Sequence, residues 1–451
     1  MPHGRMVTGA LIAVATGVGA EVVPTRPGAA PFDFQGTALV SVSDADMLAS
    51  AYVDGVLGPR QGRDALSVID LAGGHPRDFG AAEVEVTNSV AGPAVAVDVS
   101  PDGRHAFVVE TFRPRPDDGR RDHTFADLHH GNVITVVDLG DLSSPRVVQR
   151  LEIGERPESV SVNADGSMVA VAFHPDGDGG ERPLAIIPFR SGRLGAPIYP
   201  ALPGADGQRR VVQAEWHPSR DVLALVDAAT GSVRFVTVAE SGAVEVSVWG
   251  NEVVVGKFPF MARFTPDGGH LIVTNLYWGA DVEGFYNEAP RGDLGSIRLG
   301  AETGEDGSVR HALVSRAMVG PSPEGFAISP DGQWVVTADM HRSWLPWDDE
   351  RATFYSSLTL VHLDQSSGQL TAVGTFPYEG LLPEALAFDS SSRYLAVVNY
   401  DSFDDRVDGG SVDFWRLAHD PMDPNPVAPV LVRTRYSVPV THGPHSMVLV
   451  P

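Results

Sequence analysis

Three glutamates and one histidine occupy equivalent positions in a pattern that recurs along the chain. Glu158, Glu324, Glu384 and His445 each follow a proline and begin a short apolar run. Carboxyl and imidazole groups that meet in one place are destabilised unless a proton or a cation neutralises the charge. Such a cluster suits acid–base chemistry or the binding of a divalent metal. We predict Glu324, Glu384 and His445 as catalytic residues and as metal ligands, with Glu158 opposite them as a substrate-binding residue.

The same position is apolar in three other copies of the pattern, where it holds Val95, Val212 and Phe260. A polar residue is therefore not a general requirement of the fold at this position. The alternative interpretation is a water-filled channel lined by polar groups, which needs no ligand.

Long segments after the second apolar run of each copy hold most of the other reactive side chains. His341 and Arg342 lie in one such segment, and we predict His341 as a catalytic acid or metal ligand and Arg342 as the group that binds a substrate anion. Trp278 and Trp344 are predicted to wall a ligand pocket, since pockets combine aromatic side chains with a few polar groups. The alternative is that these aromatic residues only pack the loops.

Carboxylates are crowded in the same segments. Their oxygen atoms are the donors that Ca²⁺ prefers, so we predict a divalent cation as cofactor, with Ca²⁺ as the first choice. The carboxylates are Asp117, Asp118, Asp122, Asp127, Asp176, Asp178, Glu181, Asp281, Glu283, Glu288, Asp348, Asp349, Glu350, Asp401, Asp404, Asp405 and Asp408.

The elements that position these residues belong to a repeat whose starts are separated by 48 to 64 residues. Each copy has an apolar run, a turn such as Ser329-Pro330-Asp331-Gly332, and a second apolar run. Pro at the second position and Gly at the fourth are typical of a type I turn. The copies begin at Pro93, Pro157, Val211, Pro259, Pro323, Pro383 and Pro444.

Two further strand-like runs follow each hairpin, so the repeat unit has four antiparallel strands. Seven such units predict an all-β fold, a seven-bladed β-propeller. The last copy has only one run before the chain ends, and residues 37–43 supply the missing partner. We therefore predict that residues 445–450 pair with residues 37–43 and that both termini close the first blade, which removes exposed sheet edges.

Composition excludes several classes of function. The net charge of −25 and the pI near 4.8 argue against binding to nucleic acid, which needs basic groups to neutralise phosphates. The chain has no cysteine, so disulfides, zinc–thiolate sites, cysteine nucleophiles and covalent haem attachment are excluded. We expect a monomer with a small-molecule ligand.

The first residues resemble an export signal. His3 and Arg5 precede an apolar run from Met6 to Ala20, with small residues before Glu21. We predict a signal peptide at residues 1–20, a linker at 21–35 and the propeller at 36–451, hence a periplasmic or secreted protein without a membrane segment after cleavage. The alternative is a hydrophobic N-terminal tail.

The ends of the second strands carry a family likeness. The sequences VVTAD before Met340, LIVTN ending at Asn275 and LAVVN ending at Asn399 resemble the YVTN-type propeller repeat. Over residues 36–451 the chain resembles the seven-bladed lactonase-like and YVTN propeller superfamily. The resemblance implies the fold, and the superfamily includes lactone-opening and lactone-forming enzymes, secreted or surface-binding proteins and quinoprotein subunits. It assigns no catalytic residue here.

Two functions remain open at this point. The first is an exported hydrolase or lyase that acts on a lactone, an ester or a sugar acid at the mouth of the central channel. The second is a non-catalytic propeller that presents its loops to a protein or a polysaccharide. A redox subunit is disfavoured because no cysteine is available for haem attachment.

Overall fold

The computed structural model describes residues 32–451 except 73–78, 90–91, 203–208, 241–243, 304–306, 405, 408 and 419–427. The predicted signal peptide and most of the predicted linker lie outside the described residues. In the described part of the chain, no helix has both the length and the apolar character needed to cross a membrane.

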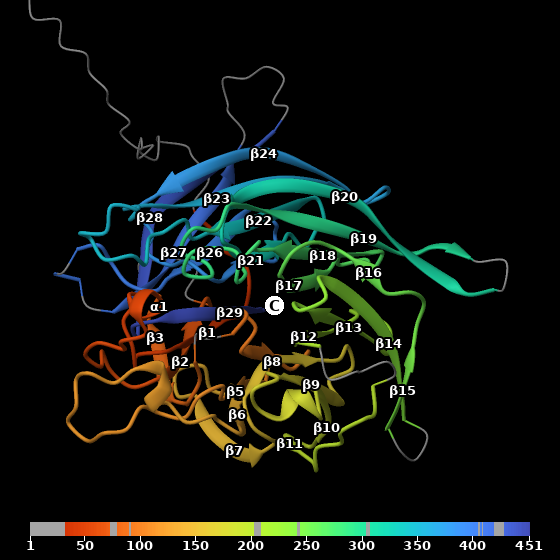
Figure 1. Cartoon of the computed structure of the whole chain (residues 1–451), viewed down its shortest axis with the longest axis horizontal. Coiled ribbons are helices and arrows are strands. Elements are labelled where there is room, and N and C mark those ends of the chain that lie inside the picture. Colours follow the sequence, from red (N-terminus) through yellow and green to blue (C-terminus); the bar gives the residue numbers. More distant parts are fainter. Residues whose placement is uncertain are drawn as a thin grey trace, which may run out of the picture. The chain divides into compact units, whose positions relative to one another are not determined.

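Seven antiparallel sheets form a ring, which confirms the predicted seven-bladed propeller (Figure 1). The sheets pair in the order β29-β1-β2-β3 for blade 1 and in chain order for the other six. The strands of blades 1 to 4 are β29 (Pro444–Val450), β1 (Ala38–Ser43), β2 (Ala65–Asp70), β3 (Ala81–Glu85); β4 (Val97–Val99), β5 (His105–Val109), β6 (Val133–Asp138), β7 (Arg146–Glu152); β8 (Pro157–Val162), β9 (Met168–Phe173), β10 (Leu184–Arg190), β11 (Arg193–Leu194); and β12 (Val211–Trp216), β13 (Val222–Asp227), β14 (Ser232–Glu240), β15 (Val244–Val248), with β16 (Val253–Val254) pairing β14. Those of blades 5 to 7 are β17 (Pro259–Phe264), β18 (His270–Asn275), β19 (Arg291–Thr303), β20 (Val309–Pro321); β21 (Pro323–Ile328), β22 (Trp334–Asp339), β23 (Ser356–Asp364), β24 (Gln369–Tyr378); and β25 (Leu386–Phe388), β26 (Tyr394–Asn399), β27 (Gly410–Ala418), β28 (Val430–Val440).

Both termini close blade 1, as the split repeat predicts. Strand β1 pairs with β29 from Ala38 opposite Val450 to Ser43 opposite Pro444. The N-terminal segment also contacts blade 7, because the backbone amide of Gln35 donates to Asp389 Oδ2 at 3.1 Å. The ring of Phe34 packs edge-on against Phe414, with 5.2 Å between the centroids. The first described residues therefore join blade 7 to blade 1.

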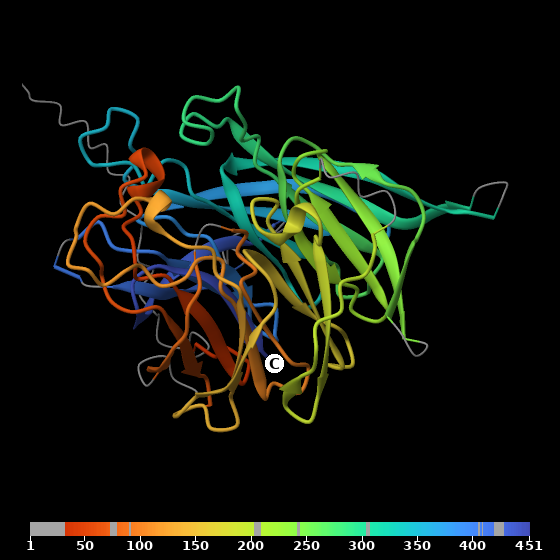
Figure 2. The same ribbon diagram turned by 60° about the horizontal axis from the view of Figure 1, so that its bottom comes forward.

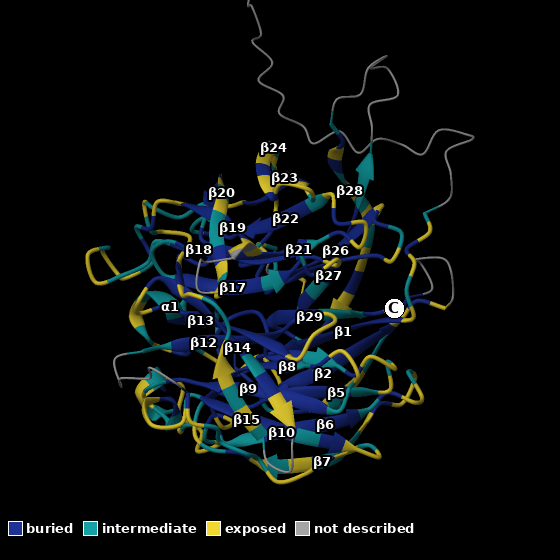
Figure 3. Ribbon diagram, turned by 90° about the vertical axis from the view of Figure 1, so that its right-hand side faces the viewer, coloured by how far each residue is buried: buried dark blue, intermediate teal, exposed yellow. Residues whose placement is uncertain are grey.

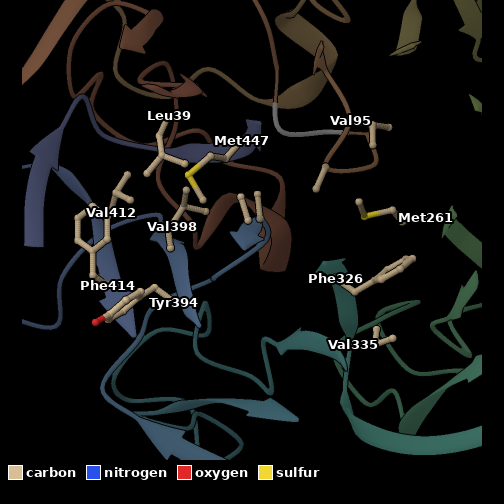
Figure 4. Packing of buried hydrophobic residues seen from close by; sticks show 14 of the residues in the cluster. Leu39, Val95, Met261, Phe326, Val335, Tyr394, Val398, Val412, Phe414 and Met447 are labelled. Carbon is tan, nitrogen blue, oxygen red and sulfur yellow. The ribbon is translucent and has the colours of Figure 1, made fainter. Parts of the chain in front are cut away.

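Apolar side chains fill the spaces between neighbouring blades. The inner strands are almost entirely buried, whereas exposed residues concentrate on outer strands and loops (Figure 3). In one such cluster, Met261 and Phe326 pack between blades 5 and 6, and Tyr394 and Phe414 pack in blade 7 (Figure 4). The core thus comes from the repeated apolar runs, which leaves the connecting loops available for a site.

In the part of the chain that the structure describes, three short helices lie in loops: α1 (Ala51–Asp54) and the 3₁₀ helices η2 (Phe125–Asp127) and η3 (Asp178–Gly180). Helix α1 lies on the same side of the ring as the loops that follow β18 and β22 (Figure 2). These segments share an apolar cluster that includes Met47, Leu57, Met340, Trp344 and Tyr400. The loops of blades 1, 5, 6 and 7 therefore form one packed layer over the ring.

Candidate functional site

A cavity of about 290 Å³ is lined by residues that lead into the innermost strands and by residues of the overlying loops. Its polar lining consists of two glutamates and two arginines, together with the hydroxyl and indole groups of aromatic residues. The aromatic lining residues are Tyr52, Phe112, Phe125, Phe258, Phe260, Trp278, Phe285, Tyr286 and Trp344. The cavity thus has a mainly aromatic wall with four charged or ionisable groups.

Glu324 and Glu384, which share one position in the aligned repeats, both lie in this lining. Glu324 is the extra residue of a β-bulge, because the register between β21 and β22 shifts between Pro323 and Gly325. A bulge re-aims a side chain away from the regular alternation of the strand. Glu158 and His445 occupy the same kind of bulge in β8 and β29.

Burial changes the ionisation of both glutamates. Their exposed fractions are only 4% for Glu324 and 2% for Glu384. Burial raises the pKa of Glu324 well above its usual range. Burial raises the pKa of Glu384 in the same way, and the neighbouring charges of Glu324 and Asp44 raise it further. Glu384 Oε2 has no hydrogen-bond partner among the described residues. The pair is therefore suited to hold one proton between two carboxyl groups.

This ionisation predicts a pH-dependent stability. When folding raises the pKa of a carboxyl group, the contribution of that group to stability is fully present below its pKa in the unfolded state. The contribution is lost as the pH rises through its pKa in the folded state. Glu384→Gln removes the titration, so we expect the melting temperature of this variant to exceed that of the wild type at pH 8. The difference should shrink towards pH 4. Melting curves at both pH values test this, with exposed Glu379→Gln as control, and a difference that is the same at both pH values would contradict it.

Two arginines from the other side of the ring complete the charged lining. Arg156 precedes β8 in blade 3 and Arg210 precedes β12 in blade 4, whereas the glutamates belong to blades 6 and 7. The Arg156 guanidinium lies 5.0 Å from the centroid of Phe112. The Arg210 guanidinium lies 5.4 Å from the centroid of Phe258. Cations over ring faces are stabilised by the π electrons, and Arg156 Nη1 is also paired with Asp176 Oδ2 at 2.9 Å.

Glu158 lies behind these arginines, fully buried, and is not part of the described lining. Its Oε1 is 3.5 Å from Arg210 Nη2 and 3.8 Å from His174 Nε2. Burial raises the pKa of Glu158 to about 7, although the charges of Arg210 and Arg156 oppose the shift. Burial beside the same arginines lowers the pKa of His174 to about 2. Glu158 is thus placed to orient Arg210, and direct substrate binding by it stays a prediction.

The structure places the two predicted histidines outside the described lining of the cavity. His445 is fully buried, its Nδ1 lies 3.2 Å from the Gly443 carbonyl oxygen, and burial lowers its pKa to about 4. His341 Nε2 lies 2.8 Å from Ser357 Oγ, and burial lowers the pKa of His341 to about 4. The catalytic roles predicted for His445 and His341 are not tested by this arrangement.

The predicted anion-binding residue Arg342 joins two loops. Its Nε donates to the Asn287 carbonyl oxygen at 2.7 Å, and its Nη2 lies 3.4 Å from Glu288 Oε2. Trp278 and Trp344, by contrast, line the cavity, and their contact with a substrate stays a prediction. The cavity lining therefore brings together four of the eight predicted site residues: Glu324, Glu384, Trp278 and Trp344.

No group of three or more His, Asp or Glu side chains in the described residues is arranged to hold a metal ion. The predicted set of Glu324, Glu384 and His445 is thus not gathered as a ligand set. The Ca²⁺ prediction for the acidic loops stays a prediction, and Asp405 and Asp408 lie outside the described residues.

Arg156 and Arg210 are not identified by the sequence analysis, although the repeat contains a signal for them. They occupy the position directly before the first residue of a repeat copy, and the same position supplies Phe258 and Leu382 to the lining. Arg156, Phe258 and Leu382 have φ values of 57°, 55° and 46°. Non-glycine residues adopt this left-handed conformation at a cost and often at functional sites. The sequence signal for these lining residues is their shared position, directly before the first residue of a repeat copy.

Comparisons with known proteins agree with this architecture. Residues 321–407 match the family model described as "Lactonase, 7-bladed beta-propeller". A putative 6-phosphogluconolactonase from Bacteroides uniformis is similar with a TM-score of 0.57 and 14% identity, over 92% of this chain and 100% of that chain. The periplasmic gluconolactonase PpgL of Pseudomonas aeruginosa gives a TM-score of 0.55 and 16% identity, over 92% and 99%. No curated protein matches the chain. The predicted resemblance to lactonase-like propellers is confirmed, and at these identities the similar structures establish the fold alone.

Proposed function

We propose that this protein is a lactone hydrolase whose active site is the aromatic cavity, with Glu324 and Glu384 as the acid–base pair. The observation that carries the proposal is the pair of buried carboxyl groups in the cavity lining, one of them with an oxygen that has no hydrogen-bond partner among the described residues. The match to the lactonase family model supports it, because residues 321–407 include both glutamates.

The ionisation of the pair assigns the two roles. The charge of Glu324 adds to burial in raising the pKa of Glu384, and on this ground we take Glu384 as the acid and Glu324 as the base. Glu324 accepts a proton from water while the water oxygen bonds to the lactone carbonyl carbon. Glu384 then gives its proton to the ring oxygen as the ring carbon–oxygen bond breaks. One water is consumed, and the product is a hydroxy acid.

Arg156 and Arg210 supply the second function of the site, the recognition of an anion. They lie across the ring from the glutamates and do not neutralise them, so a substrate with a negative group remote from the lactone would be oriented between the two pairs. Guanidinium groups suit carboxylate and phosphate because of their paired donors.

Acid release from a panel of lactones tests the proposal. We expect the purified protein to release acid from at least one lactone in a pH-stat assay at a rate proportional to protein concentration. Glu379→Gln, which alters an exposed carboxylate outside the site, should behave as the wild type. No protein-dependent acid release from aliphatic, aromatic or sugar lactones would overturn the proposal.

A non-catalytic binding propeller is the second candidate. Exposed aromatic side chains on loops of blades 6 and 7 favour it, notably Trp347 at 81% and Phe354 at 56% exposure. Such side chains suit contact with a polysaccharide or a protein. In that case Trp347→Ala should abolish partner binding, whereas Glu324→Gln and Glu384→Gln should leave it unchanged.

We also propose export to the periplasm or the medium, directed by residues 1–20. The charged start and the apolar run from Met6 to Ala20 support this. N-terminal sequencing should find a mature chain that begins near Glu21. A chain that begins at Met1 in the cytoplasmic fraction would contradict export.

A further inference from the structure

We propose that the cavity selects a lactone with an aromatic or similarly planar apolar body and an anionic substituent, in preference to a polyhydroxylated sugar lactone. This inference rests on the proposed function, since it names the substrate class of the same site.

The wall of the cavity is a continuous set of ring contacts. Trp278 lies 5.6 Å from Phe258, 5.6 Å from Phe260 and 5.4 Å from Tyr286, measured between ring centroids. Tyr286 extends the set to Trp344 at 6.1 Å and to Tyr52 at 5.9 Å. Rings at such distances bind a planar ligand by stacking and edge-to-face contact. The set joins loops of blades 1, 5 and 6 that line the cavity.

Three polar side-chain groups of this wall, those of Trp278, Trp344 and Tyr286, are already bonded within the protein. Trp278 Nε1 donates to Ser322 Oγ at 3.2 Å, and Trp344 Nε1 donates to Asn287 Oδ1 at 2.9 Å. The Tyr286 hydroxyl donates to the Tyr52 carbonyl oxygen. These residues therefore offer ring surfaces to a ligand, and hydroxyl groups of a sugar placed against them would lose water without gaining partners. Unpaired buried hydroxyl groups weaken binding strongly.

Charged groups with incomplete hydrogen bonding lie at the two ends of the cavity. Glu384 Oε2 has no partner among the described residues at one end. At the other, the buried Nε atoms of Arg156 and Arg210 have none within the described chain, and Arg156 Nη1 is paired with Asp176 Oδ2 at 2.9 Å. Arg210 makes a single long ion pair, at 3.5 Å to Glu158, and its side chain is 27% exposed. A ligand that matches this pattern has one anionic group, an apolar middle and one lactone carbonyl.

The size of the cavity agrees with a compact ligand. Its volume of about 290 Å³ lies near the lower end of the roughly 300–1,000 Å³ typical of ligand pockets. One small ring system would fill the aromatic middle and leave its anionic and lactone ends within reach of the arginines and glutamates.

Binding measurements with matched probes test the substrate class. We expect coumarin-3-carboxylate to quench the tryptophan fluorescence and to bind the wild-type protein about tenfold or more tightly than its neutral carboxamide and than D-gluconate. Phe285→Ala should weaken coumarin-3-carboxylate binding several-fold, because Phe285 lines the cavity, and its 38% exposure makes a folding defect unexpected. Phe354→Ala, at 56% exposure and outside the lining, is the matched control.

The outcomes separate this inference from the proposed function. If the protein hydrolyses D-glucono-δ-lactone through Glu324 and Glu384 but binds coumarin-3-carboxylate no more tightly than D-gluconate, the substrate class is overturned and the hydrolase stands. If the aromatic anion binds in a Phe285-dependent way and no lactone is hydrolysed, the substrate class stands and the hydrolase is overturned. Equal binding of the carboxylate and the carboxamide would overturn the role given to the arginines.

Discussion

Deletion of residues 444–451 is expected to abolish cooperative folding of the propeller. The deletion removes β29, the innermost strand of blade 1, and with it the pairing from Ala38 opposite Val450 to Ser43 opposite Pro444. It also removes Met447 from the core and opens the ring between blades 7 and 1. Strand β1 would then present an unpaired edge, which favours aggregation. The expected loss of folding stability exceeds that caused by ordinary single substitutions.

Thermal unfolding followed by circular dichroism measures this effect. Deletion of Pro451 alone is the matched control, because this residue is exposed and follows the last residue of β29. The control should melt close to the wild type, while the longer deletion should show no sharp transition or a large loss of melting temperature. An unchanged melting temperature for the longer deletion would show that the strand does not close the ring.

The second large effect is expected in catalysis. Glu324→Gln removes the base and Glu384→Gln removes the acid, and each substitution keeps the shape of the side chain. We expect each to lower kcat for the best lactone by about 10²- to 10⁴-fold, the usual contribution of a positioned proton-transfer group. KM should change little, because neither variant alters the aromatic wall or the arginines. Steady-state kinetics on folded, monodisperse protein measures both constants.

Two variants serve as comparisons for this experiment. Glu379→Gln should keep the wild-type rate. Glu158→Gln should act mainly on KM for an anionic lactone, because Glu158 contacts Arg210 and lies outside the lining. Wild-type activity in both Glu324→Gln and Glu384→Gln would exclude the pair from catalysis and direct attention to His341 and His445.

The fold is predictable from the sequence because its evidence is repeated. Each copy carries apolar runs around a turn, so an error in one copy is corrected by the others, and the incomplete last copy identifies the closing strand. Glu324 and Glu384 are predictable for the same reason, since ring symmetry turns a shared position in the repeat into proximity in space. The alignment also places His445 at this position, but its Nδ1 faces the backbone of Gly443 and the residue is enclosed in blade 1.

The rest of the site lies in parts of the chain that do not repeat. Phe112, Phe125, Phe285 and Tyr52 reach the cavity through loops of different length, and a repeat pattern does not determine the path of such loops. Arg342 is held by Asn287 and Glu288 in a contact between two of these loops, which composition alone does not reveal. The two arginines of the site occupy a shared position in the repeat, but other copies hold a different residue type there. The repeat pattern therefore indicates the position and does not predict an arginine at it.

The pH dependence of kcat/KM for lactone hydrolysis tests the coupled glutamate pair most directly. The account predicts a bell-shaped profile: activity rises as Glu324 ionises and falls as Glu384 loses its proton. Both limbs should lie above pH 4.5, the ordinary value for a glutamate, because burial raises both pKa values. Glu384→Gln should lose the falling limb. A wild-type profile governed by one group near pH 4.5, with no falling limb, would contradict the account.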